Sequence, residues 1–575
     1  MNTQHWLVRQ APPEEFYKRF PEQSRILTAL LFQRGQETQE AVDAFLEPEY
    51  SHDPHDPFLF RDMEKAVARI LTALKKKEKI TIYGDYDADG VAGAAVLFCT
   101  LREFGITPDV YIPYRMTEGY GMNLPAIEEI AKGGSTLIIT NDLGITNVEE
   151  IALAHERGVD VIISDHHTEP EKLPDAYAIV NPAVKAETYP FARLSGTGVS
   201  YKLATALLKR SVYAKDFRET PLPEGWEKWL LDLVAIGTVA DIMPLVDENR
   251  SLVTFGLAVM RKTRRKGLLA LEKTMRTALR DANTQSIGFQ IAPRLNSAGR
   301  LKHASTAFQL LVTDDDQEAA SLAEDLERTN RERQTLTDSM AREAIQQIGT
   351  PDEKTKIVFA EGEGWQRGVV GIVAGKLVHH YGLPAIVAGK DSDVNGSGRS
   401  VSAFNMIEAV QQCSAGLTKF GGHPQACGFT AKDQEAYATF KQCLTKAAAK
   451  ALTNEDLRPE LHVDMEITFF DITWDLLDDL ERLEPFGEAN PQPRFLIKDV
   501  AITDFSTVGA EGDHLRMTLT QGEISRKTIA FRRGKDAERL THGTRLDIVA
   551  VIEKNEWNGM QSLQLRIEDF MLHQQ

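Results

Sequence analysis

The chain has 575 residues, of which 42% are hydrophobic and 26% charged, and its formal net charge is −18. This length suggests about four domains, and the globular composition excludes a protein that is disordered throughout. The excess of acidic residues excludes a generally basic surface for nucleic acid, so a polyanion would have to meet a local basic groove or a bound metal.

The cysteines and the lack of long apolar runs indicate where in the cell the protein is expected. The four cysteines have no CxxC spacing, which predicts reduced, mostly buried thiols and disfavours a disulfide framework or a zinc ribbon. The first residues lack a signal-peptide pattern, and no run of about 18 apolar residues occurs. We therefore expect a cytoplasmic protein with no membrane partner. The cysteines are Cys99, Cys413, Cys427 and Cys443.

Residues 1–50 combine short helical stretches with several prolines and are predicted to form an N-terminal arm. From residue 51 to residue 312, short β-branched runs alternate with helical segments. This alternation predicts an α/β fold with a doubly wound parallel sheet. The candidate strands are KITIYGD (79–85), DVYIP (109–113), STLIITND (135–142), VDVIISDHH (159–167) and AYAIVNP (176–182).

A charged helix is predicted over residues 313–350. Leu322, Leu326, Leu336 and Met340 mark one face, which Arg333 interrupts, and this favours a helix that connects two domains over a coiled coil. Residues 351–455 begin with another strand and contain three glycine-rich stretches, so we expect a second α/β domain. From residue 456 to residue 575, short alternating strands predict a small β-barrel.

Acidic residues and histidines follow the predicted strands. In GDYDADG, three aspartates at alternate positions come directly after a strand, and in a doubly wound sheet the carboxyl ends of the strands line the ligand crevice. Taken alone, such aspartates are also typical of turns and helix caps. Four separate segments present such residues, however, which favours a common site. The residues are Asp85, Asp87, Asp89, Asp142, Asp165, His166, His167 and Asp241.

This set of side chains indicates a metal site that acts on phosphate. Carboxylates with imidazole suit Mn²⁺, and carboxylates with water suit Mg²⁺. So many carboxylates would repel one another, and two divalent ions would relieve that repulsion. Two ions close together are a common device for hydrolysing phosphate esters. The sequence therefore predicts Mn²⁺ or Mg²⁺ as cofactor, with two ions bound.

The motifs GDYDADG, ITND, SDHH and TVADIMPL resemble, in this order, the successive motifs of the DHH phosphoesterases. Within that superfamily the chain is similar to the bacterial exonucleases that degrade single-stranded DNA from the 5′ end, and the resemblance extends from about residue 50 to the end. It implies a DHH catalytic domain at 51–312, a DHH-associated substrate-binding domain at 351–455, and an OB-like nucleic-acid-binding domain at 456–575.

The resemblance also implies the roles of the acidic cluster. Asp142 would bridge both ions and so take part in catalysis, whereas direct coordination by Asp85 stays open. His167 would contact the scissile phosphate or a metal-bound water, and Asp165 would orient a neighbouring histidine. The implied metal ligands are Asp87, Asp89, Asp142, His166 and Asp241, with Asp85 in the same cluster.

Several further residues are candidates for binding the substrate. PRLNSAGRLKH (293–303) resembles the asparagine-glycine-arginine motif of the family, and an arginine near two metals offers bidentate charge neutralisation. The glycine-rich stretches 364–377, 396–405 and 420–429 match the DHH-associated domain. Arg115 is our candidate for the end phosphate, although a solvated loop charge is an equal alternative. The candidates are Arg115, Asn296, Arg300, Ser397, Arg399 and His423, of which Arg300 would also assist catalysis.

Two basic regions admit a structural and a functional interpretation. The basic run RKTRRKG (261–267) is typical of a solvent-exposed helix end, but it would also suit a surface that binds the backbone of an incoming single DNA strand. In the terminal β module, about half of the aromatic residues should belong to the core, while the others would stack on bases. These aromatic residues are Phe505, Phe531, Trp557 and Phe570, and the nearby cations are Arg516, Arg526, Lys527, Arg532, Arg533 and Lys535.

The resemblance implies a metal-dependent exonuclease that releases 5′-mononucleotides from single-stranded DNA in recombination and repair. A passage too narrow for duplex DNA would require a helicase upstream, and single-stranded-DNA-binding protein is an expected partner. One rival is a phosphodiesterase for very short oligonucleotides or cyclic dinucleotides, but such enzymes are shorter and lack the terminal β module. Another is a helicase scaffold that has lost its acidic ligands, whereas this chain retains them.

Overall fold

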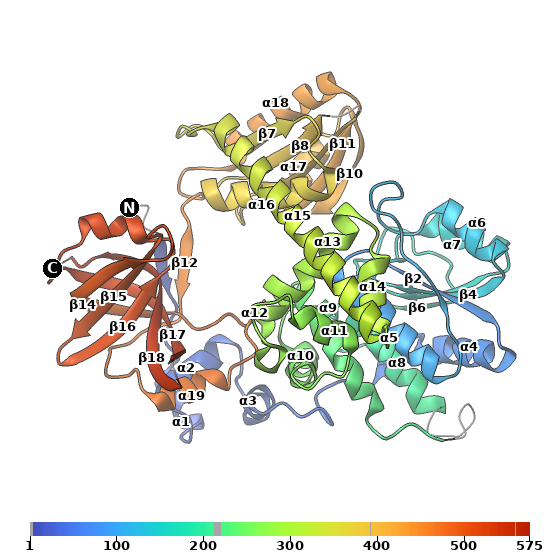
Figure 1. Cartoon of the computed structure of the whole chain (residues 1–575), viewed down its shortest axis with the longest axis horizontal. Helices are drawn as coiled ribbons and strands as arrows, with labels where there is room; N and C mark the ends of the chain where they lie inside the picture. Colours follow the sequence, from blue (N-terminus) through green and yellow to red (C-terminus); the bar gives the residue numbers. More distant parts are fainter. Residues whose placement is uncertain (1–3, 212–219, 391–392, 558, 575) are drawn as a thin grey trace. The chain divides into compact units, whose positions relative to one another are not determined.

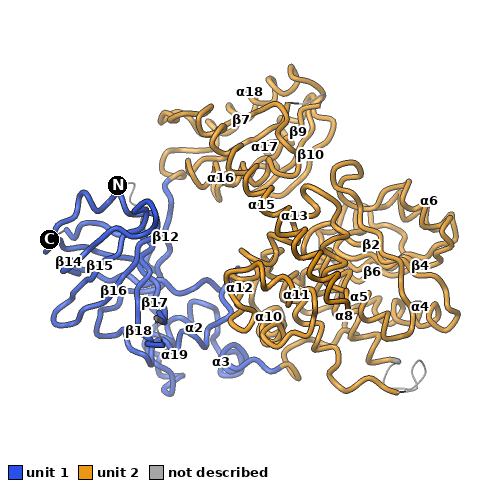
Figure 2. Tube along the Cα trace, in the orientation of Figure 1, with its two compact units in different colours: residues 1–49, 458–575 blue, residues 50–457 orange. Residues whose placement is uncertain are grey.

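The computed structural model describes residues 4–211, 220–390, 393–557 and 559–574. The chain divides into two compact units (Figure 2). One unit comprises residues 50–457, and the other combines residues 1–49 with residues 458–575. Among the described residues, no helix is both long enough and apolar enough to cross a membrane.

The first sheet of the 50–457 unit is a parallel sheet of five strands in the order β3-β2-β4-β5-β6. Each strand matches a predicted one and helices separate most of them, so the predicted parallel sheet is confirmed. The strands are β2 (Lys79–Gly84), β3 (Asp109–Tyr111), β4 (Ser135–Asn141), β5 (Asp160–Ser164) and β6 (Ala178–Val180).

Helices cover both faces of this sheet (Figure 1). Alternate strand residues point to opposite faces, so Ile80 and Ile82 belong to one apolar core while Tyr83 belongs to another. The larger core includes residues of α4 (Met63–Lys76), α5 (Ala88–Glu103) and α8 (Gly196–Ser211). The smaller core includes residues of α6 (Leu124–Lys132) and α7 (Val148–Glu156). Because both faces are buried, the strands are almost continuously apolar.

Further helices add residues to the larger core, and the long helix α15 (Asp316–Ile348) follows them along the chain. This helix corresponds to the helix predicted at 313–350. Its residues contribute both to the core of the first domain and to the core of the next, as expected for a connecting helix. The other helices are α9 (Leu231–Ala240), α10 (Asp247–Met260), α11 (Lys266–Glu272), α12 (Thr284–Ser286), η4 (Ile287–Ile291), α13 (Ala292–Leu301) and α14 (Ser305–Val312).

A second sheet follows α15, with five strands in the order β10-β11-β9-β8-β7. Only β7 and β8 pair in parallel, and the other neighbours are antiparallel. The strands are β7 (Val358–Gly362), β8 (Ala385–Lys390), β9 (Val394–Arg399), β10 (Leu417–His423) and β11 (Ala426–Ala431), and the helices are α16 (Arg367–Tyr381), α17 (Met406–Gln412) and α18 (Gln434–Ala451).

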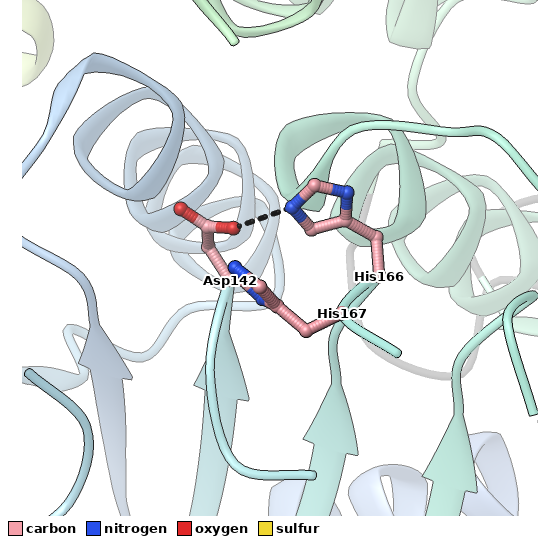
Figure 3. A group of neighbouring side chains, drawn as sticks. All are labelled: Asp142, His166 and His167. Atoms are coloured by element: carbon pink, nitrogen blue, oxygen red, sulfur yellow. Dashed lines mark ion pairs between the residues drawn. The ribbon is translucent and has the colours of Figure 1, made fainter. Parts of the chain in front are cut away.

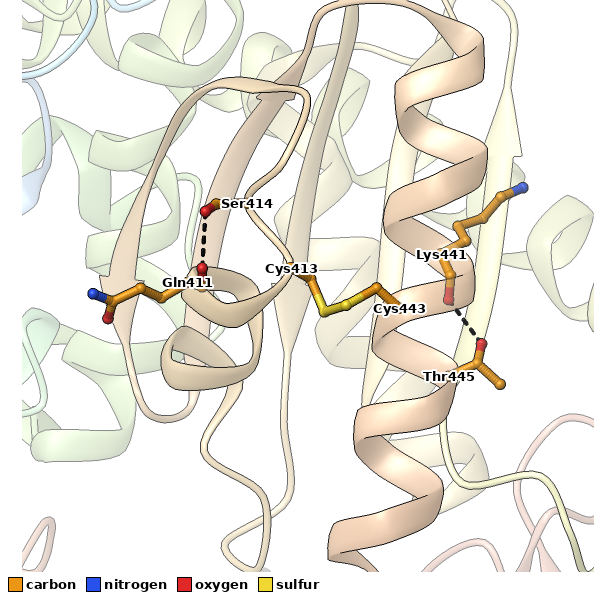
Figure 4. The surroundings of a disulfide bond; sticks show 6 residues. All are labelled: Gln411, Cys413, Ser414, Lys441, Cys443 and Thr445. Carbon is orange, nitrogen blue, oxygen red and sulfur yellow. Dashed lines mark hydrogen bonds between the residues drawn. A yellow bond between two sulfur atoms is a disulfide. The ribbon is translucent and has the colours of Figure 1, made fainter.

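The prediction of four reduced thiols is wrong for one pair of cysteines. A disulfide joins Cys413, at the end of α17, to Cys443 in α18 (Figure 4). The packing of the two helices brings the Cα atoms within 5.7 Å, a separation that a disulfide can span. Because the cysteines are 30 residues apart, no local spacing motif signals the pair. Cys99 and Cys427 are free and buried, as predicted.

The unit that holds residues 458–575 contains a β-barrel. Strands β14, β15, β16, β18 and β17 follow one another in the sheet, and β14 also pairs with β17, so these five strands close on themselves. This confirms the OB-like barrel predicted from the alternating pattern. The strands are β12 (Glu460–Val463), β13 (Met465–Glu466), β14 (Phe495–Val508), β15 (His514–Gln521), β16 (Ile524–Ala530), β17 (Arg545–Trp557) and β18 (Met560–Leu572), and α19 spans Trp474–Glu481.

The N-terminal segment folds onto this barrel unit instead of standing apart as an arm. Strand β1 (His5–Val8) pairs in parallel with β12, and the indole nitrogen of Trp6 donates to Asp569 at 3.0 Å. The helices α1 (Glu14–Arg19), α2 (Arg25–Gln33) and α3 (Gln39–Leu46) add their apolar residues to the core of the barrel unit. Sequence periodicity alone does not reveal this pairing, because the partner strands are more than 450 residues apart.

Candidate active site

The acidic residues lie at the carboxyl ends of the parallel strands because the hydrogen-bond ladder of the sheet continues into them. The amide of Asp85, directly after β2, donates to the carbonyl of Asn141 at 3.3 Å. The amide of Asp142, directly after β4, donates to the carbonyl of Ser164 at 3.0 Å. The residues that follow neighbouring strands therefore lie together at the carboxyl-terminal edge of the sheet, where a ligand crevice is expected.

Asp142 and His166 are the closest pair in this cluster (Figure 3). Asp142 has a φ of 64°, a left-handed conformation that is uncommon for a residue with a side chain and is often found at functional sites. Its Oδ1 lies 3.0 Å from Nε2 of His166. The same nitrogen lies 3.6 Å from Asp241 and 3.9 Å from Asp89, so one imidazole faces three carboxylates from three segments.

The predicted acids and histidines form three overlapping groups of potential metal ligands, in each of which the ligand atoms lie within 4.8 Å of one another. Asp142 belongs to two of the groups and His166 to two, so the groups are continuous. These groups are Asp142 with His166 and His167, Asp89 with His166 and Asp241, and Asp85 with Asp87 and Asp142.

Backbone amides hold two of the acids. Oδ1 of Asp87 accepts from the amides of Asp89 and Gly90, each at 3.0 Å, and so caps the N-terminus of α5. The carboxylate of Asp89 accepts from the amides of Gly196 and Thr197 at 2.7 Å and 2.9 Å, where α8 begins. The cap interpretation therefore holds for Asp87, and because both cap hydrogen bonds go to Oδ1, the cap does not exclude a metal ion at the other oxygen.

Asp241 comes from a helix and not from a strand. It follows the last residue of α9, whose sequence is apolar on every side and largely buried. At Gly237 a Cβ atom would lie 2.4 Å from Oδ1 of Asp89, so only glycine allows α9 to approach the acids this closely. The apolar run around Asp241 therefore serves to carry one carboxylate into a cluster that is otherwise built at strand ends.

Burial and mutual repulsion disfavour the ionised form of these carboxylates. Burial raises the pKa of Asp85 and of Asp142 well above the ordinary value, and the charges of the neighbouring aspartates raise both further. Burial and the charges of Asp89 and Asp87 raise the pKa of Asp241 to about 8. Such a cluster is ionised at neutral pH only with cations nearby.

The donor set fits divalent metal ions. Oδ1 of Asp85 is buried and has no hydrogen-bond partner among the described residues, which is costly unless an ion or a solvent molecule satisfies it. Oxygen and imidazole ligands without thiolates suit Mn²⁺ and Mg²⁺. The residues are therefore of the right kind, and lie close enough together, to hold the predicted cofactor.

Asp165 holds His167 in place. Its Oδ1 lies 2.8 Å from Nδ1 of His167 and also accepts from that residue's amide at 3.2 Å. Burial alone would lower the pKa of His167, but the hydrogen bond and charge of Asp165 outweigh it and raise the pKa to about 9. Burial lowers the pKa of His166, which favours the neutral form that metals bind.

Tyr120 is a site residue that the sequence analysis missed. Its hydroxyl lies 3.2 Å from Nδ1 of His167 and 3.3 Å from the carbonyl of Asp142, although 48% of the residue remains exposed. A single tyrosine in a loop has no periodicity that would mark it. The only signal was its position five residues after the candidate Arg115.

The asparagine and arginine of the 293–303 motif both lie in α13, but they differ in their contacts. Oδ1 of Asn296 accepts from the amide of Ala88 at 2.8 Å, so this side chain supports the turn that carries the acids. Nη1 of Arg300 donates to the carbonyl of Gly368 at 3.1 Å, at the start of α16. A Cβ atom at Gly368 would lie 2.2 Å from the carbonyl oxygen of Arg300, so glycine is required for this approach.

Ser397 and Arg399 lie together on β9. Nη1 of Arg399 donates to the hydroxyl of Ser397 at 2.9 Å, and α16 passes so close that a Cβ at Gly371 would lie 3.1 Å from both side chains. Burial lowers the pKa of Arg399, and the charge of Arg115 lowers it further. Arg115 itself lies 4.8 Å from the ring centre of Tyr86. Ser397 and Arg399 are thus in direct contact.

Neither His423 nor the basic run is joined to the acidic cluster. Within the described residues, no hydrogen bond or ion pair links the side chain of His423 to it. In the run 261–267, Arg265 is buried against Asp232 at 3.1 Å and Lys266 pairs with Asp316 at 2.8 Å. Arg264 lies over the ring of Trp229. These contacts favour the structural interpretation of the run.

The aromatic residues of the barrel unit divide as expected. Phe570 is fully buried and Phe505 packs partly against the core, whereas Phe531 is 52% exposed and its ring centre lies 5.2 Å from that of His514. The side chain of Trp557 lies outside the described part of the chain. Of the four aromatic residues named from the sequence, Phe531 is therefore the exposed candidate for base stacking within the described residues.

Three family models match the chain in the order of its domains. The N-terminal domain of the DHH family matches residues 79–238, the DHHA1 domain matches residues 354–450, and the RecJ OB domain matches residues 463–569. The first two models cover the two sheets of the 50–457 unit, and the third covers the barrel.

Known proteins resemble the whole chain. The single-stranded-DNA-specific exonuclease RecJ of Bacillus subtilis is 41% identical over 97% of this chain and 70% of its own length. The crystal structure of RecJ from Thermus thermophilus in complex with Mn²⁺ matches with a TM-score of 0.84 and 29% identity, over 99% of this chain and 80% of its own. The Mg²⁺ complex from the same organism gives a TM-score of 0.78 and 27% identity, over 99% and 79%.

Proposed function

Since the chain belongs to the RecJ family of single-stranded-DNA-specific exonucleases, we propose that it removes 5′-mononucleotides successively from the 5′ end of single-stranded DNA. It is a metal-dependent hydrolase of phosphodiester bonds, and its cofactor is Mn²⁺ or Mg²⁺. Its role lies in DNA recombination and repair.

The observation that carries the proposal is the convergence of acids and histidines from four segments on one edge of the sheet. Asp85, Asp87, Asp89, Asp142, His166 and Asp241 would hold two ions, with Asp142, which belongs to two ligand groups, between them. When bound, the two ions supply an activated water and neutralise the charge that develops on the phosphoryl oxygens.

His167 and Arg300 complete the charge around the scissile phosphate. The hydrogen bond and charge of Asp165 raise the pKa of His167, which favours an imidazole that donates a hydrogen bond to a phosphoryl oxygen. Asp165 keeps the imidazole oriented for this contact. Arg300 would add a guanidinium to the charge on the phosphate, and Asn296 supports the turn that carries Asp87 and Asp89.

The 5′ polarity follows from a separate pocket for the terminal phosphate. Arg399 contacts Ser397, the charge of Arg115 acts on Arg399, and within the described residues no ion pair engages either guanidinium. A 5′-phosphate that accepts from these three groups would set the first phosphodiester at the metals, because one nucleotide separates the two phosphates. His423, at the end of β10 two strands away from Arg399, would contact the substrate on the same side.

The expected partners follow from the substrate. A single strand binds through exposed bases and backbone, and the OB domain offers a stacking surface at Phe531. We infer that duplex DNA becomes a substrate only behind a helicase, and that single-stranded-DNA-binding protein presents the strand in the cytoplasm. Addition of a helicase with ATP should then convert blunt duplex DNA from an inert molecule into a degraded one.

A digestion assay tests the proposal. Purified protein with Mn²⁺ receives single-stranded DNA that is labelled at either end, and the matching blunt duplex. We expect mononucleotides at once from the 5′ label, a ladder from the 3′ label and no change in the duplex. Asp142→Ala should lower the rate by at least about 1,000-fold, because the residue belongs to two of the three ligand groups.

The control variant is Asp175→Ala, which removes an exposed aspartate of the same domain and should leave the rate unchanged. Mononucleotides that appear first from the 3′ label would contradict the polarity. Cleavage that is restricted to very short oligonucleotides would favour the phosphodiesterase rival. Equal activity of Asp142→Ala and the wild type would contradict the metal site itself.

A further inference from the structure

Tyr120 joins the histidine motif to the backbone of Asp142. Its hydroxyl donates to the main-chain carbonyl of Asp142 at 3.3 Å and lies 3.2 Å and 3.3 Å from the two ring nitrogens of His167. The two ring centres are 5.6 Å apart and the planes are inclined at 63°, so the rings meet edge to face. One hydroxyl therefore contacts two segments that follow the neighbouring strands β4 and β5.

The backbone of Asp142 needs contacts of this kind. Its φ of 64° is left-handed, and a residue with a side chain keeps such a conformation only where its surroundings fix it. The carbonyl of Ser164 holds its amide at 3.0 Å. The start of α8 confines its side chain, because a Cβ atom at Gly196 would lie 2.6 Å from Oδ1 of Asp142. The hydrogen bond from Tyr120 fixes the carbonyl, which is the third point.

Tyr120 is exposed and yet firmly held. Although 48% of the residue is exposed, the chain is fixed on either side of it. Two residues earlier, the carboxylate of Glu118 accepts from the amide of Tyr114 at 2.6 Å. Two residues later, the main chain of Met122 makes two hydrogen bonds with the side-chain amide of Asn147, each at 3.3 Å. A solvated surface tyrosine has no need of such support, whereas a side chain that positions others does.

The contact with His167 leaves this imidazole free to bind a substrate. Nδ1 of His167 lies 2.8 Å from Asp165, whereas the hydroxyl of Tyr120 is almost equally far from both ring nitrogens. It therefore lies beside the ring between the two nitrogens and off the axis of either N–H, where a hydrogen bond is weak. The hydroxyl limits rotation of the ring, and Nε2 can still donate to a phosphoryl oxygen.

We propose that Tyr120 is a positioning residue that sets the geometry of Asp142 and His167 together. This rests on the proposed function, in which Asp142 lies between two ions and His167 donates to the scissile phosphate. The hydroxyl fixes the backbone from which the carboxylate of Asp142 extends and the plane in which the imidazole lies. Its loss should loosen both groups without removing either, so it should affect metal affinity and the chemical step more than DNA binding.

Removal of the hydroxyl alone provides the test. Tyr120→Phe keeps the ring, and we expect kcat at saturating Mn²⁺ to fall about tenfold while KM for single-stranded DNA changes less than about twofold. A second measurement does not depend on activity. Titration of the metal-free protein with Mn²⁺, followed by the electron paramagnetic resonance of the free ion, should show an affinity that is about tenfold weaker than that of the wild type.

A matched variant and the unfolding temperature separate this role from general support of the fold. Tyr114→Phe removes a hydroxyl from the same loop, and within the described residues no hydrogen bond involves that hydroxyl, so neither measurement should change. Both variants should unfold at the wild-type temperature, because Tyr120 is half exposed.

An unchanged kcat or Mn²⁺ affinity of Tyr120→Phe would overturn the proposal. A rise in KM alone would do so too, since the hydroxyl would then only touch DNA. A loss of affinity that comes with a lower unfolding temperature would assign the hydroxyl to the fold instead of the site. If the wild type cuts no single strand, the proposed function fails, and the Mn²⁺ titration still decides the role of Tyr120.

Discussion

The side chains of Arg399 and Ser397 are arranged as a ready-made anion site. The guanidinium already donates to the hydroxyl and to the carbonyl of Gly398, so its orientation is fixed before substrate arrives. Burial lowers the pKa of Arg399 but leaves it cationic at neutral pH. A terminal phosphate, which can carry two negative charges, would bind to this pair more tightly than a terminal hydroxyl would.

Arg399→Ala should therefore remove the preference for a 5′-phosphate. We expect kcat/KM on 5′-phosphorylated single strands to fall by about 10- to 100-fold, and activity on 5′-hydroxyl strands to change little, because charge-assisted hydrogen bonds contribute about 1.5–3 kcal/mol. Parallel digestion of the two substrates measures this ratio. Lys432→Ala, which removes an exposed cation beyond β11, serves as the control. A variant that retains the wild-type ratio would refute the pocket.

At this scale the sequence predicted residue types better than contacts. The pattern of acids and histidines was sufficient to select side chains that lie close together, since each member follows a recognisable strand or apolar run. Their roles as metal ligands stay predictions. The pattern could not assign Asn296 to a backbone amide, because the partner Ala88 is 208 residues away. Tyr120 had no signal of its own, and the roles of Arg115, His423 and the other substrate residues stay predictions.

Among the elements, helix α4 is tied to the opposite end of the sheet from the active site. Nε of Arg69 lies 2.6 Å from Asp160 at the start of β5, and a terminal nitrogen lies 2.8 Å from Glu78, directly before β2. Thr136 of β4 donates to the same carboxylate at 2.8 Å. One guanidinium thus links a helix to the beginnings of three strands and keeps their carboxyl ends aligned.

Glu78→Gln should destabilise the fold in a pH-dependent way. Burial alone would raise the pKa of Glu78, but hydrogen bonds from Thr136 and Arg69 lower it below its ordinary value of 4.5. The carboxylate therefore stabilises the folded state above pH 4.5, and this contribution is lost as the pH falls through the lowered pKa. We expect the variant to be less stable by about 1 kcal/mol at pH 7 and equal to the wild type near pH 3.

Urea unfolding at several pH values measures this difference. Glu129→Gln, at an exposed position of α6, should show no pH-dependent loss. A difference between Glu78→Gln and the wild type that grows as the pH falls would contradict the assigned direction of the pKa shift.

The strands were predictable because both faces of the sheet are buried, which leaves continuous apolar runs that end at glycine or aspartate. The long helix was predictable for the opposite reason, since its charges and single apolar face are typical of a helix between domains. The disulfide and the helical origin of Asp241 were not predictable, because both depend on how helices pack and not on local spacing.

For the whole molecule, the main departure from the sequence prediction concerns residues 1–49. Eight apolar side chains of this segment belong to the core of the barrel unit: Phe16, Phe20, Leu27, Leu30, Leu31, Val42, Phe45 and Leu46. Polar contacts add to them, as when Arg34 donates to Asn490 at 2.7 Å. The segment lacks the length for a core of its own and completes one that is formed mainly by residues far along the chain.

The barrel fragment 458–575 should not fold stably by itself. Burial of eight such side chains contributes more than about 10 kcal/mol, which is comparable to the whole stability of a typical domain of about 5–15 kcal/mol. We expect the isolated fragment to aggregate or to unfold without cooperativity, and co-expression with residues 1–49 to restore a cooperative thermal transition. A sharp transition of the isolated fragment at the temperature of the pair would contradict this.

The pairing of β1 with β12 also has a consequence for protein synthesis. Residues 1–49 leave the ribosome before residues 50–457, but their partners follow only after the roughly 400 residues of the other unit, which takes about 20–80 s at about 5–20 residues per second. During this time their apolar side chains have no core to join. The nascent chain is therefore expected to expose an apolar surface that chaperones can bind, long before it can bind DNA.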